Sequence, residues 1–328
     1  MAYRVLIPQD IAKEGKEYLL SRGYEIRMGN GYTEQDMIRD AADCQAILLR
    51  TAEVTAAVLE AGKELKIVAR HGAGYNNVDI RRAEKLGIWV TNTPGVTTES
   101  VAEYTIGGML TMARRIPEHQ EKMKEGDFFY KNSHKGTDLK GKTLGIIGIG
   151  NIGLEVARKA HFGFDMEILA YSPRRKQEQM PEYVRLVPWE ELFERSDMVS
   201  LHVPLSQETR GFIGKAEFER MKPTAYLINC SRGGVVVETE LVEALKAGQI
   251  AGLFTDVMEQ EPPEKDHPFF FMDNVVVTPH MASNTEDCMR QMALGAAIQI
   301  DRVLSGGKPD FPVNRPEQRT VCLGLPEN

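Results

Sequence analysis

The sequence predicts an α/β protein with two domains, each built on a doubly wound parallel sheet. The length of 328 residues leaves room for about two domains with a buried core each. Short apolar runs alternate with amphipathic stretches in two successive series, and a glycine-rich turn opens the second series. Such alternation is typical of parallel sheets, because each crossover between parallel strands needs a long connection, usually a helix.

The first series covers residues 1 to about 100. We expect its strands at 3–7, 46–49, 65–69 and 88–90, with helices between them. The turn-forming residues at 91–96 mark a candidate domain border. A single helix is expected over 98–125, with Gly126 ending it. Two adjacent glycines within this helix, Gly107 and Gly108, indicate close packing on a neighbouring backbone.

The second series begins after residue 142. Six apolar runs are expected to form strands, at 143–148, 166–171, 198–203, 225–230, 251–255 and 274–278. Six strands that start with a glycine turn match a complete doubly wound dinucleotide-binding domain. A strong helical pattern follows at 284–304, and residues 305–328, rich in proline and glycine, are expected to run over the surface.

The glycine turn has the order that dinucleotide-binding folds use. Gly148, Gly150 and Gly153 form a G-x-G-x-x-G pattern between a predicted strand and a predicted helix. This spacing lets the backbone approach a pyrophosphate, which then lies at a helix N-terminus where free N–H groups favour negative charge. Glycines also serve ordinary turns, but the strand before this one and the helix after it favour the dinucleotide interpretation.

The residues after the next strand bear on the choice between NAD and NADP. NAD enzymes usually have an acidic residue there for the ribose 2′-hydroxyl, whereas this chain has Ser172, Arg174 and Arg175. Guanidinium groups bind a 2′-phosphate, and a carboxylate would repel it. We therefore expect NADP, with NAD as the alternative if these cations only cover an exposed turn and Ser172 serves either cofactor.

Composition excludes several classes of partner. The net charge of -7 gives no general attraction to nucleic acid or anionic membranes, and no apolar run is long enough to span a bilayer. The four cysteines, Cys44, Cys230, Cys288 and Cys322, are scattered and suggest neither a zinc site nor a disulfide framework. The apolar run at the N-terminus is too short for a signal peptide. We expect a cytoplasmic protein without a metal, a membrane span or a nucleic-acid partner.

Three polar residues follow strands of the second series, where open α/β sheets bind ligands. Arg232 can bind a substrate carboxylate with its fork and polarise a carbonyl, and His280 can transfer a proton near neutral pH. Glu261 is the candidate carboxylate that orients the imidazole. Together these groups suit the reduction of a 2-keto acid by hydride transfer. Taken singly, each also has a structural or surface explanation, and their order after a dinucleotide fold is what favours catalysis.

At these residues the chain resembles the D-isomer-specific 2-hydroxyacid dehydrogenase family. The resemblance covers nearly the whole chain, and its signatures are the stretches 92–103, 145–153, 202–205, 229–234, 256–262 and 278–280. It implies a Rossmann cofactor domain at 101–291, inserted into a flavodoxin-like substrate domain formed by 1–100 and completed by 292–328. It also implies a catalytic site in the cleft between the domains and a homodimer formed through the cofactor domains, with the 98–125 segment contributing.

The resemblance also implies roles for individual residues. Arg232, Glu261 and His280 would be catalytic, as the residue chemistry suggests. Residues near the cofactor would be Asn151 and Ile152 at the pyrophosphate, residue 172 at the ribose, Cys230 and Ser231 beside the nicotinamide, Asp256 at the carboxamide, and the segment 280–283, ending at Ser283, around the pocket. His202 is expected to be structural.

Substrate contacts are expected from the first domain. The loop containing Ala73 and Gly74 would offer backbone N–H groups to the substrate carboxylate, in addition to Arg232. Arg50 follows a strand and resembles the position that phosphoglycerate dehydrogenases use near their substrate phosphate, although it also suits a generic surface or carboxylate-side arginine. The favoured activity is NAD(P)H-dependent reduction of a small 2-keto acid to a D-2-hydroxy acid, as in glyoxylate or hydroxypyruvate reductases. The alternatives are a 3-phosphoglycerate dehydrogenase and a non-catalytic, nucleotide-sensing corepressor.

Overall fold

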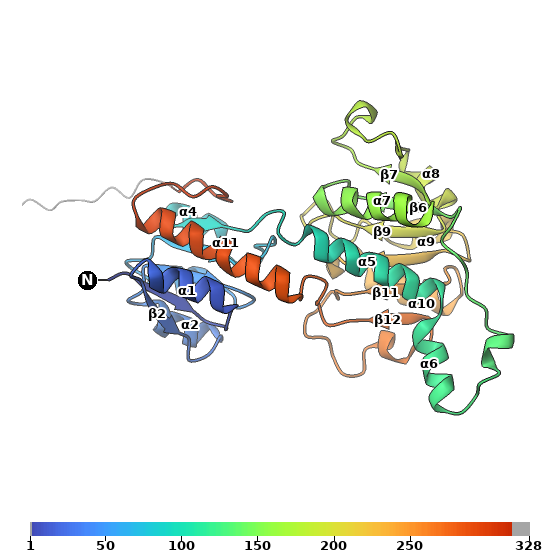
Figure 1. The fold of residues 1–328 in the computed structure, drawn as a ribbon, viewed down its shortest axis with the longest axis horizontal. Coiled ribbons are helices and arrows are strands. Elements are labelled where there is room, and N and C mark those ends of the chain that lie inside the picture. Colours follow the sequence, from blue (N-terminus) through green and yellow to red (C-terminus); the bar gives the residue numbers. More distant parts are fainter. Residues whose placement is uncertain (1, 317–328) are drawn as a thin grey trace, which may run out of the picture. The chain divides into compact units, whose positions relative to one another are not determined.

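A computed structural model describes residues 2–316, which form two compact units. Unit 1 consists of the chain up to Thr97 together with the segment that begins at Thr285, and unit 2 is Thr98–Asn284. The border expected at 291 from the sequence falls inside the last helix, α11 (Glu286–Leu304), which belongs as a whole to unit 1. Each unit is an α/β layer structure with one parallel sheet, in agreement with the predicted fold class (Figure 1).

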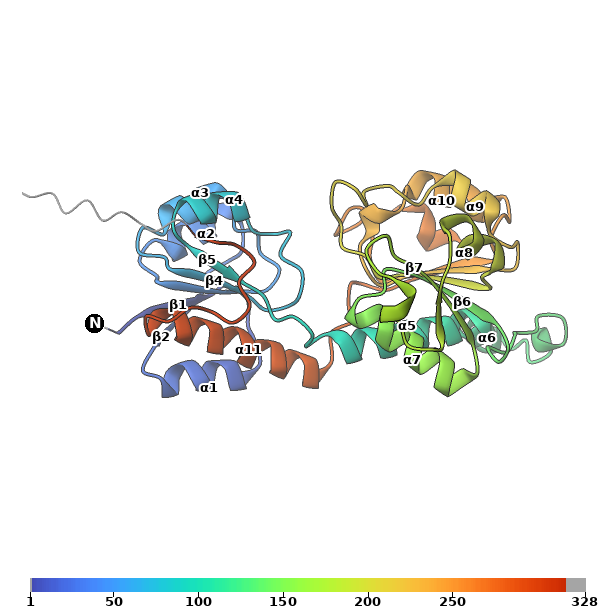
Figure 2. The same cartoon turned by 90° about the horizontal axis from the view of Figure 1, so that it is seen from above.

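Unit 1 contains a five-stranded parallel sheet in the order β2-β1-β3-β4-β5. Its strands are β1 (Arg4–Ile7), β2 (Glu25–Met28), β3 (Ala46–Leu49), β4 (Ile67–Arg70) and β5 (Trp89–Thr91), and its other helices are α1 (Lys13–Ser21), α2 (Glu34–Ala41), α3 (Ala56–Ala61) and α4 (Ile80–Lys85). Helices α1 and α11 cover one face and α2, α3 and α4 the other (Figure 2). Alternate strand residues therefore enter two separate cores, Leu6 on one side and Val5 and Ile7 on the other.

Two features of unit 1 differ from the sequence expectation. Strand β2 was not predicted, because this edge strand has the sequence Glu-Ile-Arg-Met and none of its residues is fully buried. The segment after α11 does not simply run over the surface. Asn314 is buried, and its side chain bonds both the Val90 N–H at 2.9 Å and the Ile88 carbonyl at 2.9 Å. Residues 317–328, including Cys322, lie outside the described part of the chain.

Unit 2 contains a seven-stranded parallel sheet in the order β12-β11-β10-β9-β6-β7-β8. Its strands are β6 (Thr143–Ile147), β7 (Glu167–Tyr171), β8 (Val184–Leu186), β9 (Met198–Leu201), β10 (Tyr226–Asn229), β11 (Gly252–Thr255) and β12 (Val275–Val277). Helices α5 (Thr98–Ala113) and α7 (Asn151–Phe164) pack side by side on one face. Helices α8 (Trp189–Arg195), α9 (Lys215–Arg220) and α10 (Glu238–Lys246) lie on the other face (Figure 2).

Three features of unit 2 also differ from expectation. The short edge strand β8 was not predicted, because its sequence Val-Arg-Leu is no sustained apolar run. The expected helix over 98–125 is broken at Arg115, which has a positive φ of 52° and separates α5 from α6 (Ile116–Lys124). Gly108 does pack closely, but a Cβ there would meet the ring of Phe254 at 2.5 Å and not a backbone. Gly126, with φ of +86°, follows the end of α6 as expected.

None of the helices within residues 2–316 is long and apolar enough to cross a membrane. The same residues contain no group of three or more His, Cys, Asp or Glu side chains arranged to hold a metal ion. Cys44, Cys230 and Cys288 are buried and are not joined in a disulfide.

Candidate active site

The glycine turn joins β6 to α7, as the sequence predicts. Different physical reasons explain why glycine occupies each of its three positions. A Cβ on Gly148 would lie 2.4 Å from the carbonyl oxygen of His202, and Gly148 has φ of +95°. A Cβ on Gly153 would lie 2.2 Å from the carbonyl oxygen of Gly148. These two glycines are therefore required for the turn to pack on the helix and on the neighbouring strand end.

Gly150 is different, because no atom lies within 4 Å of where its Cβ would be. Packing inside the protein therefore does not require a glycine there, whereas close approach of a ligand to the backbone would. Gly150 is the N-cap of α7, and no side chain caps this helix end, whose first residues are Asn151 and Ile152. This open cradle at a helix N-terminus fits the pyrophosphate of a dinucleotide.

The residues expected at the ribose follow strand β7. Ser172 is half-buried directly after Tyr171, and Arg174 and Arg175 are exposed. Neither guanidinium forms a salt bridge within the described residues, so both stay available to an anion. A hydrogen bond from Ser206, followed by its own backbone and the charge of Arg174, lowers the pKa of Glu208 in the loop after β9.

His280 and Glu261 form a direct pair on neighbouring loops. His280 follows β12 and Glu261 follows β11, and the imidazole Nδ1 lies 2.7 Å from the carboxylate Oε2. The other carboxylate oxygen accepts the backbone N–H of Met258 at 3.1 Å. Partial burial by itself would raise the pKa of Glu261, but bonding to His280 and Met258 and the charge of Arg232 lower it overall. Glu261 is thus stabilised as a carboxylate that accepts a hydrogen bond from the Nδ1–H of His280.

The segment carrying His280 is held by Asp256, which is 1 % exposed. One carboxylate oxygen of Asp256 accepts the Thr278 hydroxyl at 2.7 Å and the Met281 N–H at 2.9 Å. The other accepts the Ala282 N–H at 2.7 Å. These bonds fix the turn in which His280 has a positive φ of 51°. The structure thus gives Asp256 a positioning role for His280, and its expected contact with the carboxamide stays a prediction.

Arg232 lies in the turn after β10, packed against the loop that carries Glu261. A Cβ on the next residue, Gly233, would lie 2.0 Å from the Met258 backbone, so only glycine permits this approach. Asn229 braces the turn, since its side chain donates to the Arg232 carbonyl at 3.0 Å and accepts from Ser231. Burial lowers the pKa of Arg232, and the charge of Glu261 opposes this effect. The structure thereby brings Arg232, Glu261 and His280 to one edge of the sheet.

The remaining site residues of unit 2 differ in accessibility. Cys230 is buried, and burial raises the pKa of its thiol to about 12, so it stays protonated. Ser231 is buried and bonded to Asn229, whereas Ser283 is half-buried after Ala282. Burial lowers the pKa of His202 to about 4, and its Nε2 lies 2.8 Å from the Ser200 hydroxyl. A neutral, internally bonded imidazole supports the structural role expected for His202.

In unit 1, the expected substrate residues lie after strands β3 and β4. Arg50 donates to the Asp10 carbonyl at 2.8 Å. The Ala73 carbonyl accepts the side chain of Asn92 at 2.7 Å, while the N–H groups of Ala73 and Gly74 have no partner within the described residues. His71 begins this loop, and burial, followed by the charge of Arg50, lowers its pKa to about 4. The loop thus presents two backbone donors beside a neutral imidazole.

The model of the D-isomer specific 2-hydroxyacid dehydrogenase family, NAD binding domain, matches residues 106–282, which lie in unit 2. A glyoxylate reductase from Korarchaeum cryptofilum is 42% identical over 334 residues, covering 99% of this chain and 99% of the relative. The chain belongs to this dehydrogenase family. It is therefore an oxidoreductase of an NAD(P)-dependent enzyme family, as predicted from the ordered motifs.

Two further relatives show that the family includes proteins named for different activities. A D-3-phosphoglycerate dehydrogenase from Archaeoglobus fulgidus is 39% identical over 315 residues, covering 95% of this chain and 59% of the relative, so the chain spans little more than half of that protein. An NADPH-dependent glyoxylate/hydroxypyruvate reductase from Sinorhizobium meliloti, solved with NADP and malonate, has a TM-score of 0.85 and 29% identity, covering 96% of this chain and 98% of that one. The two-domain fold predicted from the resemblance is confirmed by this likeness.

Sequence reasoning missed residues that shape the site without being obvious chemical groups. Asn229 braces the turn of Arg232, and an amide at the end of an otherwise apolar strand, just before Ser-Arg-Gly-Gly, was an available signal. The contacts of Asp256 had no such signal, because its partners lie more than twenty residues away. The catalytic, cofactor and substrate roles assigned to individual residues stay predictions.

Proposed function

We propose that this protein reduces a small 2-keto acid to a D-2-hydroxy acid with NAD(P)H, in the manner of a glyoxylate or hydroxypyruvate reductase. One observation carries the proposal. The Glu261–His280 pair, joined at 2.7 Å, lies at the carboxyl end of the sheet with Arg232 packed on the same loop. A proton donor, its orienting carboxylate and a cation for the substrate are the protein groups that this reaction needs.

In the proposed mechanism each group has one task. Because Nδ1 of His280 faces Glu261, the opposite nitrogen, Nε2, delivers the proton to the substrate carbonyl oxygen. Glu261 holds the ring orientation and stabilises the imidazolium before transfer. Arg232 binds the substrate carboxylate and stabilises the negative charge that develops on the carbonyl oxygen. A bound nicotinamide supplies the hydride in reduction and accepts it in oxidation.

The experiment that tests this activity is a panel of 2-keto acids assayed with both cofactors. Glyoxylate, hydroxypyruvate, pyruvate, branched 2-keto acids and 3-phosphohydroxypyruvate are each mixed with NADPH or NADH, and oxidation is followed at the nicotinamide absorbance band. We expect the highest kcat/KM with an unphosphorylated small keto acid. If none of these compounds leads to oxidation of NADPH or NADH, the proposal is contradicted and a non-catalytic binding protein is favoured.

The alternative, a 3-phosphoglycerate dehydrogenase, receives support from the name of the relative in Archaeoglobus fulgidus. In that case Arg50 binds a substrate phosphate, and Arg50→Ala abolishes use of 3-phosphohydroxypyruvate while sparing glyoxylate. The side chain already donates to the Asp10 carbonyl, which makes it a backbone-braced cation at the end of β3. The same panel run on Arg50→Ala separates the two activities.

We expect NADPH to be preferred over NADH because of the basic turn after β7. The Arg174→Ala/Arg175→Ala variant should weaken NADPH binding by roughly tenfold for each charge-assisted hydrogen bond lost, with little change for NADH. Titration calorimetry with each cofactor measures this directly, and NADH serves as the internal control. An equal loss for both cofactors, or tighter binding of NADH by the unaltered protein, would contradict the assignment.

We infer that a second copy of the chain covers the exposed apolar residues around α6. No residue of α6 is buried, and Phe129, after this helix, is 72 % exposed. Figure 1 shows α6 and the following loop projecting from the rest of unit 2. Ile116, Met123 and Phe128 are also more than half exposed, and several exposed large apolar side chains on one projecting segment favour an interaction site there. The family resemblance also implies a homodimer formed through this part of the chain.

The dimer predicts a specific change in sedimentation. Phe129→Asp should shift the protein towards the monomer in sedimentation velocity, because it places a charge in an apolar interface. Phe311→Asp is the matched control, since Phe311 is 47 % exposed and lies in unit 1. A monomeric unaltered protein, or an equal effect of both substitutions, would refute this arrangement.

A further inference from the structure

The loop that carries Glu261 is held by a second histidine–carboxylate pair that the proposed mechanism does not use. Glu238 is the first residue of α10, and its side chain lies against the loop between β11 and β12. His267 lies near the far end of this loop. Both side chains are largely buried, with 18 % of Glu238 and 16 % of His267 exposed. Charge-assisted hydrogen bonds that are largely buried are weakened less by solvent than exposed ion pairs are.

The two oxygens of Glu238 bind the loop on both sides of Glu261. Oε2 accepts the backbone N–H of Glu259 at 3.1 Å, two residues before Glu261. Oε1 lies 2.8 Å from Nε2 of His267, six residues after Glu261. One carboxylate from a separate helix therefore ties together both ends of the segment in which Glu261 is placed. Glu238 makes no hydrogen bond with Glu261 itself among the described residues.

The surroundings of His267 fix its tautomer and its position. The Phe269 N–H donates to Nδ1 of His267 at 3.3 Å, so the neutral ring has its hydrogen on Nε2 and donates it to Glu238. Phe269 is buried in the core of unit 2, and its ring centroid lies 4.8 Å from that of His267. Glu238 thus connects the loop to a histidine that is itself anchored in the core.

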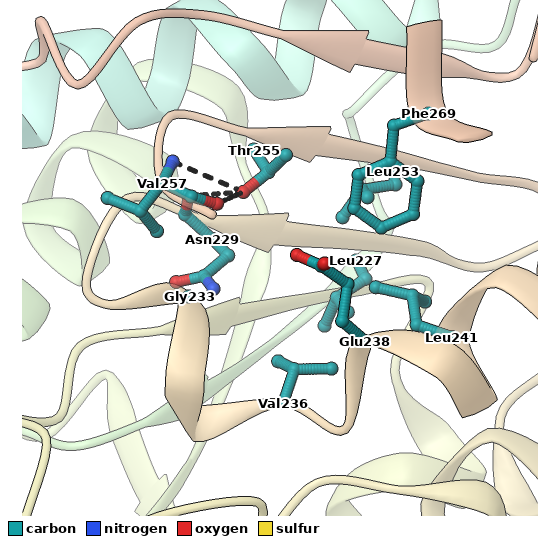
Figure 3. A pocket seen from close by; sticks show the side chains of 10 residues that line it. All are labelled: Leu227, Asn229, Gly233, Val236, Glu238, Leu241, Leu253, Thr255, Val257 and Phe269. Carbon is teal, nitrogen blue, oxygen red and sulfur yellow. Dashed lines mark hydrogen bonds between the residues drawn. The ribbon is translucent and has the colours of Figure 1, made fainter. Parts of the chain in front are cut away.

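The same region contacts the turn of Arg232. Glu238, Asn229, Gly233 and Thr255 all line one small pocket between β10, β11 and α10 (Figure 3). Gly233 packs on the backbone of Met258 and Glu259, and the N–H of Glu259 is bonded to Glu238. The contacts made by Glu238 thus extend to the backbone on which both Arg232 and Glu261 depend.

We propose that Glu238 and His267 are positioning residues that hold Glu261 at hydrogen-bond distance from His280. This inference rests on the proposed function, in which the Glu261–His280 pair delivers the proton. We call the bonds of Glu238 to the Glu259 N–H and to His267 the clamp. Loss of the clamp lets the loop move and lengthens the bond between Glu261 and Nδ1 of His280. Displacement of a catalytic group by about 1 Å is enough to lower turnover by as much as 100-fold.

The test compares substitutions in the clamp with a matched change on the same helix. Glu238→Gln keeps the shape but has one accepting oxygen in place of two, and Glu238→Ala removes both bonds. Glu243→Gln is the control, because Glu243 is exposed on α10 and makes none of these contacts. His267→Gln preserves an N–H donor towards Glu238, whereas His267→Ala does not. Each variant is first checked for native circular dichroism.

We expect kcat to fall roughly tenfold in Glu238→Gln and up to about 100-fold in Glu238→Ala, with little change in KM for the keto acid or in cofactor affinity. Glu243→Gln should match the unaltered protein, and His267→Gln should retain more activity than His267→Ala. If Glu238 and His267 are purely structural, their substitutions should lower thermal stability but should not lower kcat selectively at a nearly constant KM. Unaltered kcat in correctly folded Glu238→Gln and His267→Ala would overturn the proposal.

A spectroscopic measurement separates failure of the clamp from failure of the proposed function. The Nδ1 proton of His280, bonded to a carboxylate, should give a low-field proton resonance that is absent in His280→Ala. We expect this signal to be lost or moved upfield in Glu238→Ala and retained in Glu243→Gln, whether or not any keto acid is reduced. Persistence of the signal at an unchanged position in Glu238→Ala would refute the clamp, even if the enzyme proves active.

Discussion

His280→Ala is expected to lower kcat by roughly 100-fold to 10,000-fold, the range that a positioned general acid–base contributes. The alanine has no group to deliver a proton to the carbonyl oxygen, and water in its place would lack the orientation that Glu261 imposes at 2.7 Å. Cofactor affinity should change little, since the substitution removes only the imidazole and keeps the backbone bond of residue 280 to the Asp256 carbonyl at 2.8 Å. Steady-state kinetics at saturating keto acid and a fluorescence titration of NADPH measure the two quantities separately.

Two variants make this result specific. Glu261→Gln keeps an oxygen that can accept from Nδ1 but removes the negative charge, so kcat should fall by less than in His280→Ala. His119→Ala is the matched histidine control, because His119 lies on α6, apart from the loops after β10, β11 and β12, and its ring contacts that of Tyr130. Near-normal turnover in His280→Ala would remove His280 as the acid–base. A loss of equal size in His119→Ala would point to general destabilisation.

Most of the strands that the sequence predicts are largely buried, and β12, an edge strand of three valines, is the exception. In β3, β9 and β11 every residue is buried, because both faces of a parallel sheet are covered by helices. Such strands are continuous apolar runs and can be recognised locally. The edge strands β2 and β8 contain charged residues and depend on a single neighbour, so their pairing energy comes from tertiary context that no local pattern contains.

The break between α5 and α6 has a different explanation. Arg115 has a left-handed backbone that glycine usually supplies, and the apolar and polar pattern continues across it. The Arg115 side chain donates two hydrogen bonds to Glu118, at 2.5 and 2.7 Å, and these bonds offset the energetic cost of the left-handed backbone. The sequence did contain a signal for this break. Pro117 lies in the first turn of α6, and a proline within a continuous helix would remove a backbone hydrogen bond and clash with the preceding turn.

For the site, order along the chain predicted proximity correctly for a physical reason. Strands β10, β11 and β12 are adjacent and parallel, so the residues that follow them meet at one edge of the sheet. Arg232, Glu261 and His280 each follow one of these strands. Whether a polar side chain at this edge faces a ligand or the protein itself depends on the loop conformation. Asp256 is an example, since its carboxylate oxygens are bonded to the loop that carries His280.

Arg232→Lys should raise KM for the keto acid and lower kcat together, because Arg232 acts on both the substrate carboxylate and the developing charge at the carbonyl. Bonds to charged groups contribute about 1.5–3 kcal/mol each, so losing one corresponds to roughly a tenfold to 100-fold decrease in kcat/KM. Lysine keeps the charge but presents a point donor in place of a planar fork. The shorter head group also loses the bond of 2.6 Å to the Ser231 carbonyl, which orients the guanidinium.

The comparison that isolates carboxylate binding uses substrates that differ only in that group. If Arg232 binds the carboxylate, Arg232→Lys should weaken use of a 2-keto acid much more than use of the matching keto amide, which cannot form a charged pair with the fork. Arg220→Lys is the control, since Arg220 is an exposed residue paired with Glu194 at 3.3 Å. An unchanged KM for the keto acid would count against carboxylate binding by Arg232. Equal losses for acid and amide would assign it to polarising the carbonyl alone, because only that task is common to both substrates.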